Sequence, residues 1–157
     1  MEYRQLGRSG LQVSEIGLGT NNFGQQDRPP FHIRAPGAEA IINQALDVGI
    51  NFIDTANSYA DGLSEEFIGR ALKGKRHRAV IATKVSTRVG EGPNLAGNSR
   101  KHIIDEVDKS LRRLFLEEFV GELDVSGDET IDATVGLRRA EELYDKVFFE
   151  YGDDSVA

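Results

Sequence analysis

The stretch Gly49-Ile-Asn-Phe-Ile-Asp-Thr-Ala-Asn-Ser-Tyr59, a helix-like segment, and then Ala79-Val-Ile-Ala-Thr-Lys-Val85 decide the fold of this chain. The two short apolar runs are continuous, and the segment between them has helical spacing. Such runs are typical of buried strands in a parallel sheet. We therefore predict an α/β fold. We expect Asp54, Tyr59 and Lys84, which follow the two runs, to meet at the carboxyl rim of the sheet, where parallel sheets place their ligands.

The same alternation extends on both sides of this stretch. Glycine-rich residues 7–10 between two short runs indicate an N-terminal β-hairpin, and Gly49 and Gly74 are expected to end helices. Ser64 and Ser99 are predicted N-caps. The expected elements are a hairpin at 2–14, strands at 16–19, 50–53 and 79–85, a loop at 21–37, and helices that begin near 38, 64 and 99.

The chain changes character near residue 114. Residues 1–114 contain 16 Lys and Arg against 13 Asp and Glu, whereas residues 115–157 contain 3 against 13. No fourth strand follows the helix that is expected to end at 114. Helical spacing continues instead, and a last amphipathic helix is expected over 137–151. We therefore predict two segments, 1–114 as an α/β unit and 115–157 as an acidic, mainly helical tail of different origin.

Composition excludes several classes of protein. The chain has 157 residues and no cysteine, so neither a disulfide framework nor a thiolate metal site is expected, and we predict no metal site. Its N-terminus lacks an apolar signal-like region, and no apolar run is long enough to span a bilayer. The acidic surface expected for the tail argues against binding of nucleic acid or anionic membranes by that segment, and we expect neither as a partner. We expect a soluble, cytoplasmic protein.

Asp54, Tyr59 and Lys84 suggest acid–base chemistry. A tyrosine phenol ordinarily has a pKa of about 10, and a nearby lysine cation favours the phenolate form. With an aspartate holding that lysine in place, Tyr59 could donate a proton to a carbonyl oxygen that receives a hydride. Spacing alone favours the alternative in which all three are ordinary polar residues at strand ends. The glycines at 17 and 19 likewise either permit tight packing or let Gly19 and Thr20 approach a ligand.

Four segments resemble the aldo-keto reductase family. They are Tyr3-Arg-Gln-Leu-Gly-Arg-Ser-Gly-Leu-Gln-Val-Ser14, Ile16-Gly-Leu-Gly-Thr20, Gly49 to Tyr59, and Ile81-Ala-Thr-Lys-Val85. The resemblance runs from residue 3 to about 114 and implies a partial (β/α) barrel that uses NADP(H) to reduce aldehydes and ketones. It implies that Tyr59 is the acid, that Lys84 makes the phenol more acidic, and that Asp54 partners Lys84. Gly19, Thr20 and Asp54 would contact the cofactor.

The chain departs from the family pattern after residue 114. The family places a catalytic histidine on a fourth strand, and none of His32, His77 and His102 occupies that position. The tail from Arg139 to Ala157 resembles a fragment of proteins related to the FAD-dependent thymidylate synthases, without their flavin-binding motif, which suggests a hybrid. Two functions therefore stay open: a truncated carbonyl reductase with weak or no turnover, and a non-catalytic interaction module. A homodimer through the open sheet edge is one expected partner arrangement.

Overall fold

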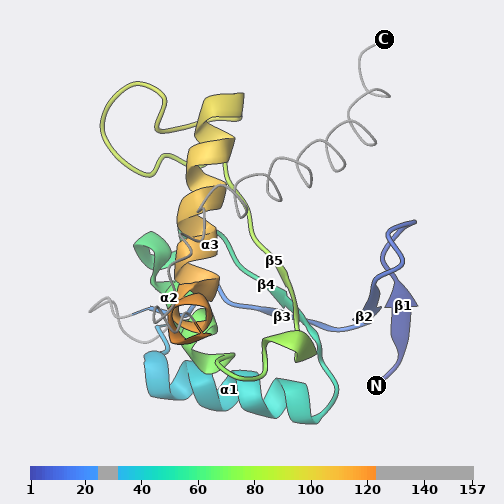
Figure 1. Ribbon diagram of the computed structural model, residues 1–157. Coiled ribbons are helices and arrows are strands. Elements are labelled where there is room, and N and C mark those ends of the chain that lie inside the picture. The colour runs from blue at the N-terminus through green and yellow to red at the C-terminus, as the bar shows by residue number, and fades with distance from the viewer. Residues whose placement is uncertain (25–31, 123–157) are drawn as a thin grey trace, which may run out of the picture. The chain divides into compact units, whose positions relative to one another are not determined.

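Three short parallel strands form the centre of the computed structural model, which describes residues 1–24 and 32–122 (Figure 1). They are β3 (Gly17–Gly19), β4 (Phe52–Asp54) and β5 (Val80–Ala82), in the order β3-β4-β5. Their register aligns Gly19 with Asp54 and Asp54 with Ala82, so the three strands end at one rim. The predicted α/β fold with three parallel strands is confirmed.

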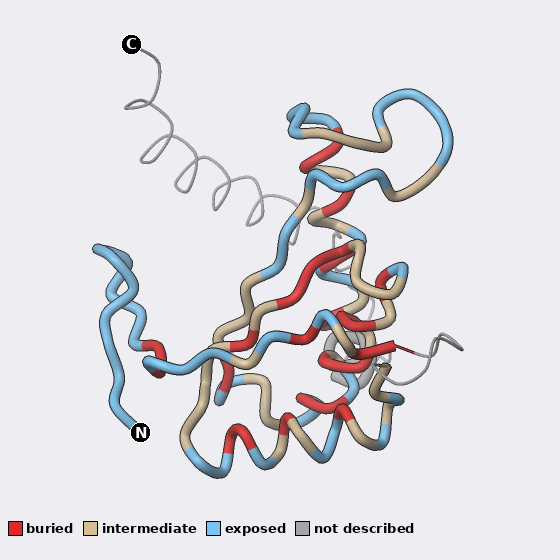
Figure 2. The backbone as a smooth tube through the Cα atoms, turned by 180° about the vertical axis from the view of Figure 1, so that it is seen from behind, coloured by how far each residue is buried: buried red, intermediate tan, exposed pale blue. Residues whose placement is uncertain are grey.

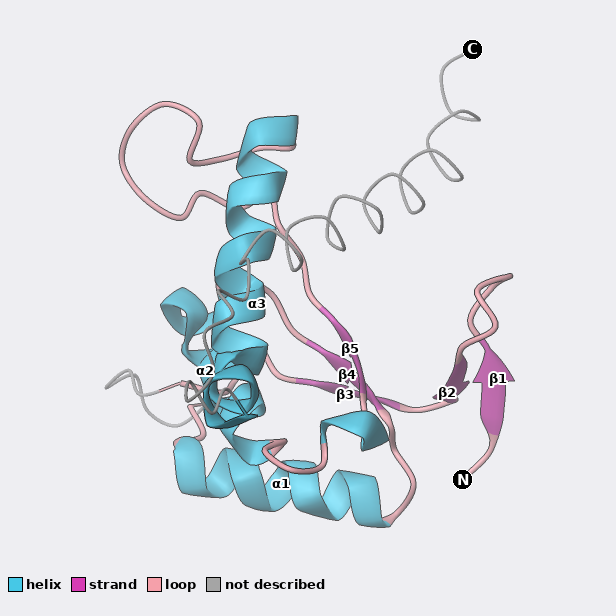
Figure 3. Ribbon diagram, in the orientation of Figure 1, coloured by secondary structure: helices cyan, strands magenta, loops and turns pink. Residues whose placement is uncertain are grey.

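The helices pack on the sheet through one apolar core. The helices are α1 (Ala35–Asp47), α2 (Leu63–Ala71) and α3 (Arg100–Glu122), with short 3₁₀ turns η1 (Tyr59–Gly62) and η2 (Arg76–Arg78) (Figure 3). The middle residue of each strand faces this core: Leu18, Ile53 and Ile81 pack with residues of all three helices. Ile53 is fully buried, whereas its two neighbours on the edge strands are only partly buried.

The N-terminal hairpin is hydrogen-bonded to the segment just before β4, at the N-terminal end of the parallel strands. It consists of β1 (Tyr3–Gln5) and β2 (Gln12–Ser14), paired antiparallel as predicted. The Tyr3 hydroxyl donates to the Gly49 carbonyl at 2.8 Å, and the Asn51 side chain accepts from Ser14 N at 2.7 Å. Most of the hairpin is exposed, as the pale tube in Figure 2 shows.

Two sequence predictions about helix starts are wrong. The loop expected at 21–37 is shorter, because α1 already begins at Ala35 with Pro36 in its first turn. Proline is favoured there, since the missing N–H has no partner in a helix start anyway. The N-cap of α2 is Gly62, with φ 93°, rather than Ser64. Ser64 lies inside the helix, fully buried, and its Oγ donates to the Thr20 carbonyl at 2.9 Å.

The long helix α3 begins where it was predicted to begin, and only some of its apolar residues are buried. His102 N donates to Ser99 Oγ at 3.2 Å, which confirms Ser99 as the N-terminal cap. Ile103 and Leu114 are buried, but Leu111 is 39% exposed and does not belong to the core. The helix continues past 114 to Glu122, and the predicted 137–151 helix lies outside the described residues. The boundary at residue 114 stays a prediction.

Candidate functional site

The Lys84 ammonium joins the three residues that the sequence singles out. Its Nζ lies 2.7 Å from Asp54 Oδ2 and 3.4 Å from the Tyr59 hydroxyl, and it donates to the Thr55 carbonyl at 2.8 Å. The same Nζ is 5.1 Å from the centre of the Tyr59 ring. The structure therefore brings an acid, a phenol and an amine to one point on the rim, as predicted.

Backbone pairing beyond the strands explains this meeting. Thr55 N donates to the Ala82 carbonyl at 2.8 Å, and Asn57 N donates to the Lys84 carbonyl at 3.1 Å. The segments after β4 and β5 thus run together for several residues past the assigned strands. This extension keeps Lys84 beside the turn that begins at Tyr59.

Electrostatics keeps Lys84 charged. Burial acts to lower the pKa of its ammonium, but hydrogen bonds and charge interactions with Asp54 and Tyr59 outweigh it and hold that pKa above the ordinary 10.5. The Lys84 side chain is 49% exposed and that of Asp54 40%. A solute at the rim can therefore reach the pair.

The predicted cofactor contacts Gly19 and Thr20 lie in different surroundings. Gly19 is exposed beside Asp54, and a Cβ added to it would meet no atom within 4 Å. Thr20 is fully buried, and both its N and its Oγ1 donate to the Asp54 carbonyl, at 3.0 and 2.9 Å. The Thr20 side chain thus ties the end of β3 to β4, and only Gly19 offers open backbone.

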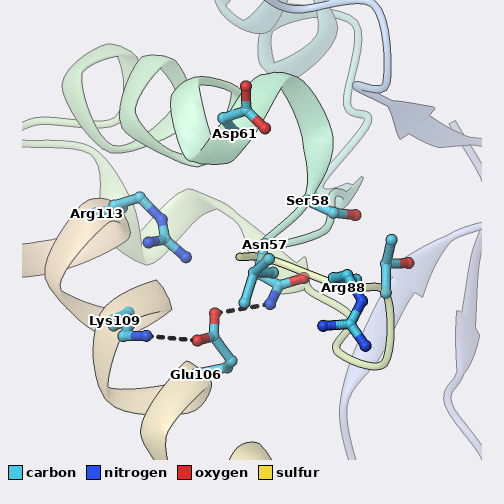
Figure 4. Close-up of a pocket in the computed structure, with 9 residues that line it drawn as sticks. Asn57, Ser58, Asp61, Arg88, Glu106, Lys109 and Arg113 are labelled. Atoms are coloured by element: carbon cyan, nitrogen blue, oxygen red, sulfur yellow. Dashed lines mark hydrogen bonds and ion pairs between the residues drawn. The ribbon is translucent and has the colours of Figure 1, made fainter. Parts of the chain in front are cut away.

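A polar pocket of about 230 Å³ includes Ser58, the residue before Tyr59, in its lining (Figure 4). It is lined by residues of the segments after β4 and β5 and of α3: Asn57, Ser58, Asp61, Thr87, Arg88, Val89, Glu106, Lys109 and Arg113. Sequence reasoning missed this pocket, because α3 contributes its residues through contacts about 50 positions away along the chain. The only local signal was the polar loop after Lys84.

Glu106 is the buried acid of this pocket. Its side chain is 3% exposed, and it accepts from Asn57 Nδ2 and Lys109 Nζ, at 2.8 and 2.7 Å (Figure 4). Burial acts to raise the pKa of this carboxyl, but the hydrogen bonds from Lys109 and Asn57 outweigh it and hold the pKa below its ordinary value. Glu106 is therefore a carboxylate at neutral pH.

The histidines lie elsewhere. His77 is an exposed residue of the turn η2. His102 is a fully buried residue of α3, and neither of its ring nitrogens has a hydrogen-bond partner in the described part of the chain. Within residues 1–24 and 32–122, neither the Lys84 ammonium nor the Tyr59 hydroxyl forms a hydrogen bond with a histidine. In the same residues no three His, Asp or Glu side chains gather as a metal site, and no helix is long and apolar enough to cross a membrane.

Comparisons with known proteins agree on one family. The model of the aldo/keto reductase family matches residues 15–119. The chain is 39% identical over 121 residues to a probable voltage-gated potassium channel subunit beta of Oryza sativa subsp. japonica, covering 74% of this chain and 35% of that protein. It is 33% identical over 147 residues to an uncharacterized oxidoreductase, YqkF, of Bacillus subtilis (strain 168), covering 88% and 45%.

Solved structures give the same result. The aldo-keto reductase AKR11C1 from Bacillus halodurans, in a holo form, is 40% identical with a TM-score of 0.61, covering 73% of this chain and 36% of that one. The putative aldo-keto reductase PA4992 from Pseudomonas aeruginosa is 37% identical with a TM-score of 0.62, covering 71% and 42%. This chain thus spans between about a third and a half of the length of these relatives.

Proposed function

This chain belongs to the aldo/keto reductase family, and from that premise we propose that its rim carries the proton-donating part of an NADPH-dependent carbonyl-reduction site. The observation that carries the proposal is the bonding of one ammonium, Lys84 Nζ, to Asp54 at 2.7 Å and to the Tyr59 hydroxyl at 3.4 Å. A phenol held against a fixed cation is suited to give up a proton.

The described residues fit the reactive end of a nicotinamide cofactor. Gly19 presents backbone without a side chain and faces open space, so a flat ring can approach the end of β3. Asp54 and Lys84 supply polar groups next to it. A bound NADPH would supply the hydride for reduction of an aldehyde or a ketone.

The chain's own residues handle the proton. Tyr59 donates its hydroxyl proton to the carbonyl oxygen of the substrate as the carbon receives hydride, and the phenolate that remains takes a proton from water afterwards. Lys84 stabilises that phenolate by charge, while its bond to Asp54 keeps the ammonium in place. Asp54 is thus a positioning residue, and Tyr59 is the acid.

The test combines cofactor binding with turnover of a small aldehyde. NADPH is titrated by fluorescence and its consumption is followed by absorbance, for the wild type, Tyr59→Phe and Lys84→Met. We expect Tyr59→Phe to bind NADPH as the wild type does and to lose about 100-fold or more in kcat, because general acid catalysis contributes about that much. Tyr3→Phe is the matched control, since the Tyr3 hydroxyl lies in the hairpin and donates to the Gly49 carbonyl, away from Lys84.

The alternative function, a non-catalytic interaction module, predicts a different result. Losing positioning and binding contacts costs an enzyme orders of magnitude in rate. No saturation at about millimolar NADPH, the upper end of the range of about 1 μM to 1 mM in which enzyme KM values commonly lie, would favour the module. Equal turnover by Tyr59→Phe and the wild type would refute the proposed role of Tyr59.

A further inference from the structure

The pocket beside the rim contains a cation that is held in place and left unneutralised. Arg88 Nη1 donates to two carbonyls of its own loop, Gly90 O at 3.2 Å and Gly92 O at 3.3 Å. No carboxylate forms an ion pair with Arg88 in the part of the chain that the structure describes. The guanidinium is therefore oriented by its loop, with donors left over for an anion.

Asn57 supplies a hydrogen-bond acceptor, whereas Arg88 supplies donors. Asn57 is 4% exposed and its Nδ2 donates to Glu106, while its buried Oδ1 has no hydrogen-bond partner among residues 1–24 and 32–122. Figure 4 shows the amide nitrogen on the Glu106 side and the amide oxygen on the Arg88 side. A buried acceptor without a partner costs free energy, so a ligand that brings a donor to it gains affinity.

The other cations of the pocket already have carboxylate partners, one inside the pocket and one behind it. Lys109 is paired with Glu106 at 2.7 Å, and Arg113 with the buried Glu65 at 2.6 Å. Asp61 lies at the far end of the pocket from Arg88 in Figure 4. Arg88 and Asn57 are therefore two groups of the pocket with bonding capacity to offer a ligand, in addition to the hydroxyls of Ser58 and Thr87.

We propose that this pocket binds a small α-hydroxycarboxylate, whose carboxylate is held by Arg88 and whose hydroxyl donates to Asn57 Oδ1. The volume of about 230 Å³ suits a ligand of this size and is below the range of about 300 Å³ and more that drug-sized ligands need. Neither the Tyr59 proton nor a nicotinamide takes part. The binding is thus separate from the proposed reaction and can succeed or fail independently of it.

Paired ligands test the two contacts without changing the buried network. Glycolate, which has both groups, and acetate, which lacks the hydroxyl, are titrated into the ¹⁵N-labelled full chain and followed by NMR. We expect glycolate to saturate with shifts at residues around Asn57 and Arg88, and acetate to bind several-fold more weakly. Arg88→Gln should weaken glycolate about tenfold or more, the typical effect of losing a charge-assisted hydrogen bond.

Arg112→Gln is the matched control, because Arg112 is an exposed arginine of α3 that pairs with Asp108 and does not line the pocket. It should bind glycolate as the wild type does. Equal affinity for glycolate and acetate would remove Asn57 from the proposal. Equal affinity of wild type and Arg88→Gln, or shifts that never saturate, would overturn the site as a whole.

Discussion

At the scale of single residues, Lys84 links the site to the pH dependence of stability. Its pKa lies above 10.5 in the folded chain, so its contribution is fully present below the unfolded value and is lost as pH rises through the folded one. The stability difference between wild type and Lys84→Met should therefore stay constant from about pH 6 to about pH 9 and shrink above about pH 10.5.

The expected size of that difference is small. The pair is nearly half exposed, and exposed ion pairs contribute at most about 1 kcal/mol. Urea unfolding at several pH values measures it. Lys73→Met is the control, because Lys73 is exposed and its side chain forms no ion pair or hydrogen bond within residues 1–24 and 32–122. A difference that grows with alkaline pH would contradict the assignment of Lys84 as a partnered cation.

Glu65 connects three parts of the fold, α2, α3 and the segment after β5. This fully buried carboxylate of α2 accepts from Arg113 Nε of α3 at 2.6 Å and from Thr83 Oγ1, just after β5, at 2.5 Å. Glu65→Gln leaves the Arg113 guanidinium without its counter-charge, and breaking a largely buried pair costs about 3 kcal/mol. Urea unfolding should show this loss.

Glu66→Gln, the neighbouring control, changes a partly exposed carboxylate that pairs with Arg70 at 3.4 Å. It should alter the free energy of unfolding by less than about 0.5 kcal/mol. Similar losses in the two variants would mean that the buried pair does not lock α2 to α3.

At the scale of elements, Gly69 sets how closely α2 approaches α3. A Cβ at this position would lie 2.4 Å from the Arg113 carbonyl oxygen and 3.1 Å from that of Leu114. Backbone atoms cannot move aside as a side chain can, so Gly69→Ala must push the helices apart. We expect a loss of about 1–3 kcal/mol despite the better helix propensity of alanine.

The control for this change is Gly37→Ala in α1. An added Cβ there would meet only the Ile33 Cγ2 methyl group, at 2.9 Å. Side-chain adjustment can relieve that contact, and helix propensity offsets it. Thermal unfolding should therefore separate the two variants, and an equally stable Gly69→Ala would show that the helices are not in close contact.

The elements also show how far the sequence can predict this fold. Continuous apolar runs predicted β4 and β5, and the position of Asp54, Tyr59 and Lys84 after these runs predicted their meeting at one rim. The start of α2 was mispredicted because it depends on a rare backbone: Ala60, Asp61 and Gly62 all have positive φ. Nothing local to Ala60 predicts a left-handed conformation, which tertiary contacts impose.

Long-range contacts explain the other misses. Serine is a residue type that commonly caps helices, but the Ser64 hydroxyl instead donates to the carbonyl of Thr20, 44 residues away along the chain. Glu106 pairs with Asn57 across 49 residues, so spacing in the sequence does not reveal the pocket. Side chains that meet only after the helices pack on the sheet lie beyond what local patterns indicate.

At the scale of the whole molecule, the outer edge of β5 is where another strand could pair with the sheet. In residues 1–24 and 32–122, β5 pairs only with β4. Val80 N donates to the Asn51 carbonyl and the Ala82 carbonyl accepts from Thr55 N, so the backbone groups of Ile81 between them point outward. Such an unpaired edge templates pairing with another strand.

We propose that a second copy of the chain pairs along this edge. Light scattering over a range of protein concentrations should show a mass that rises from one chain toward two. Val80→Lys should keep the protein monomeric, because the charge stands next to the edge on the face opposite the core-packed Ile81. Val80→Thr, which keeps the β-branched shape without a charge, should still associate. A wild type that stays monomeric at every concentration would refute the pairing, and equal association of the lysine variant would place the contact elsewhere.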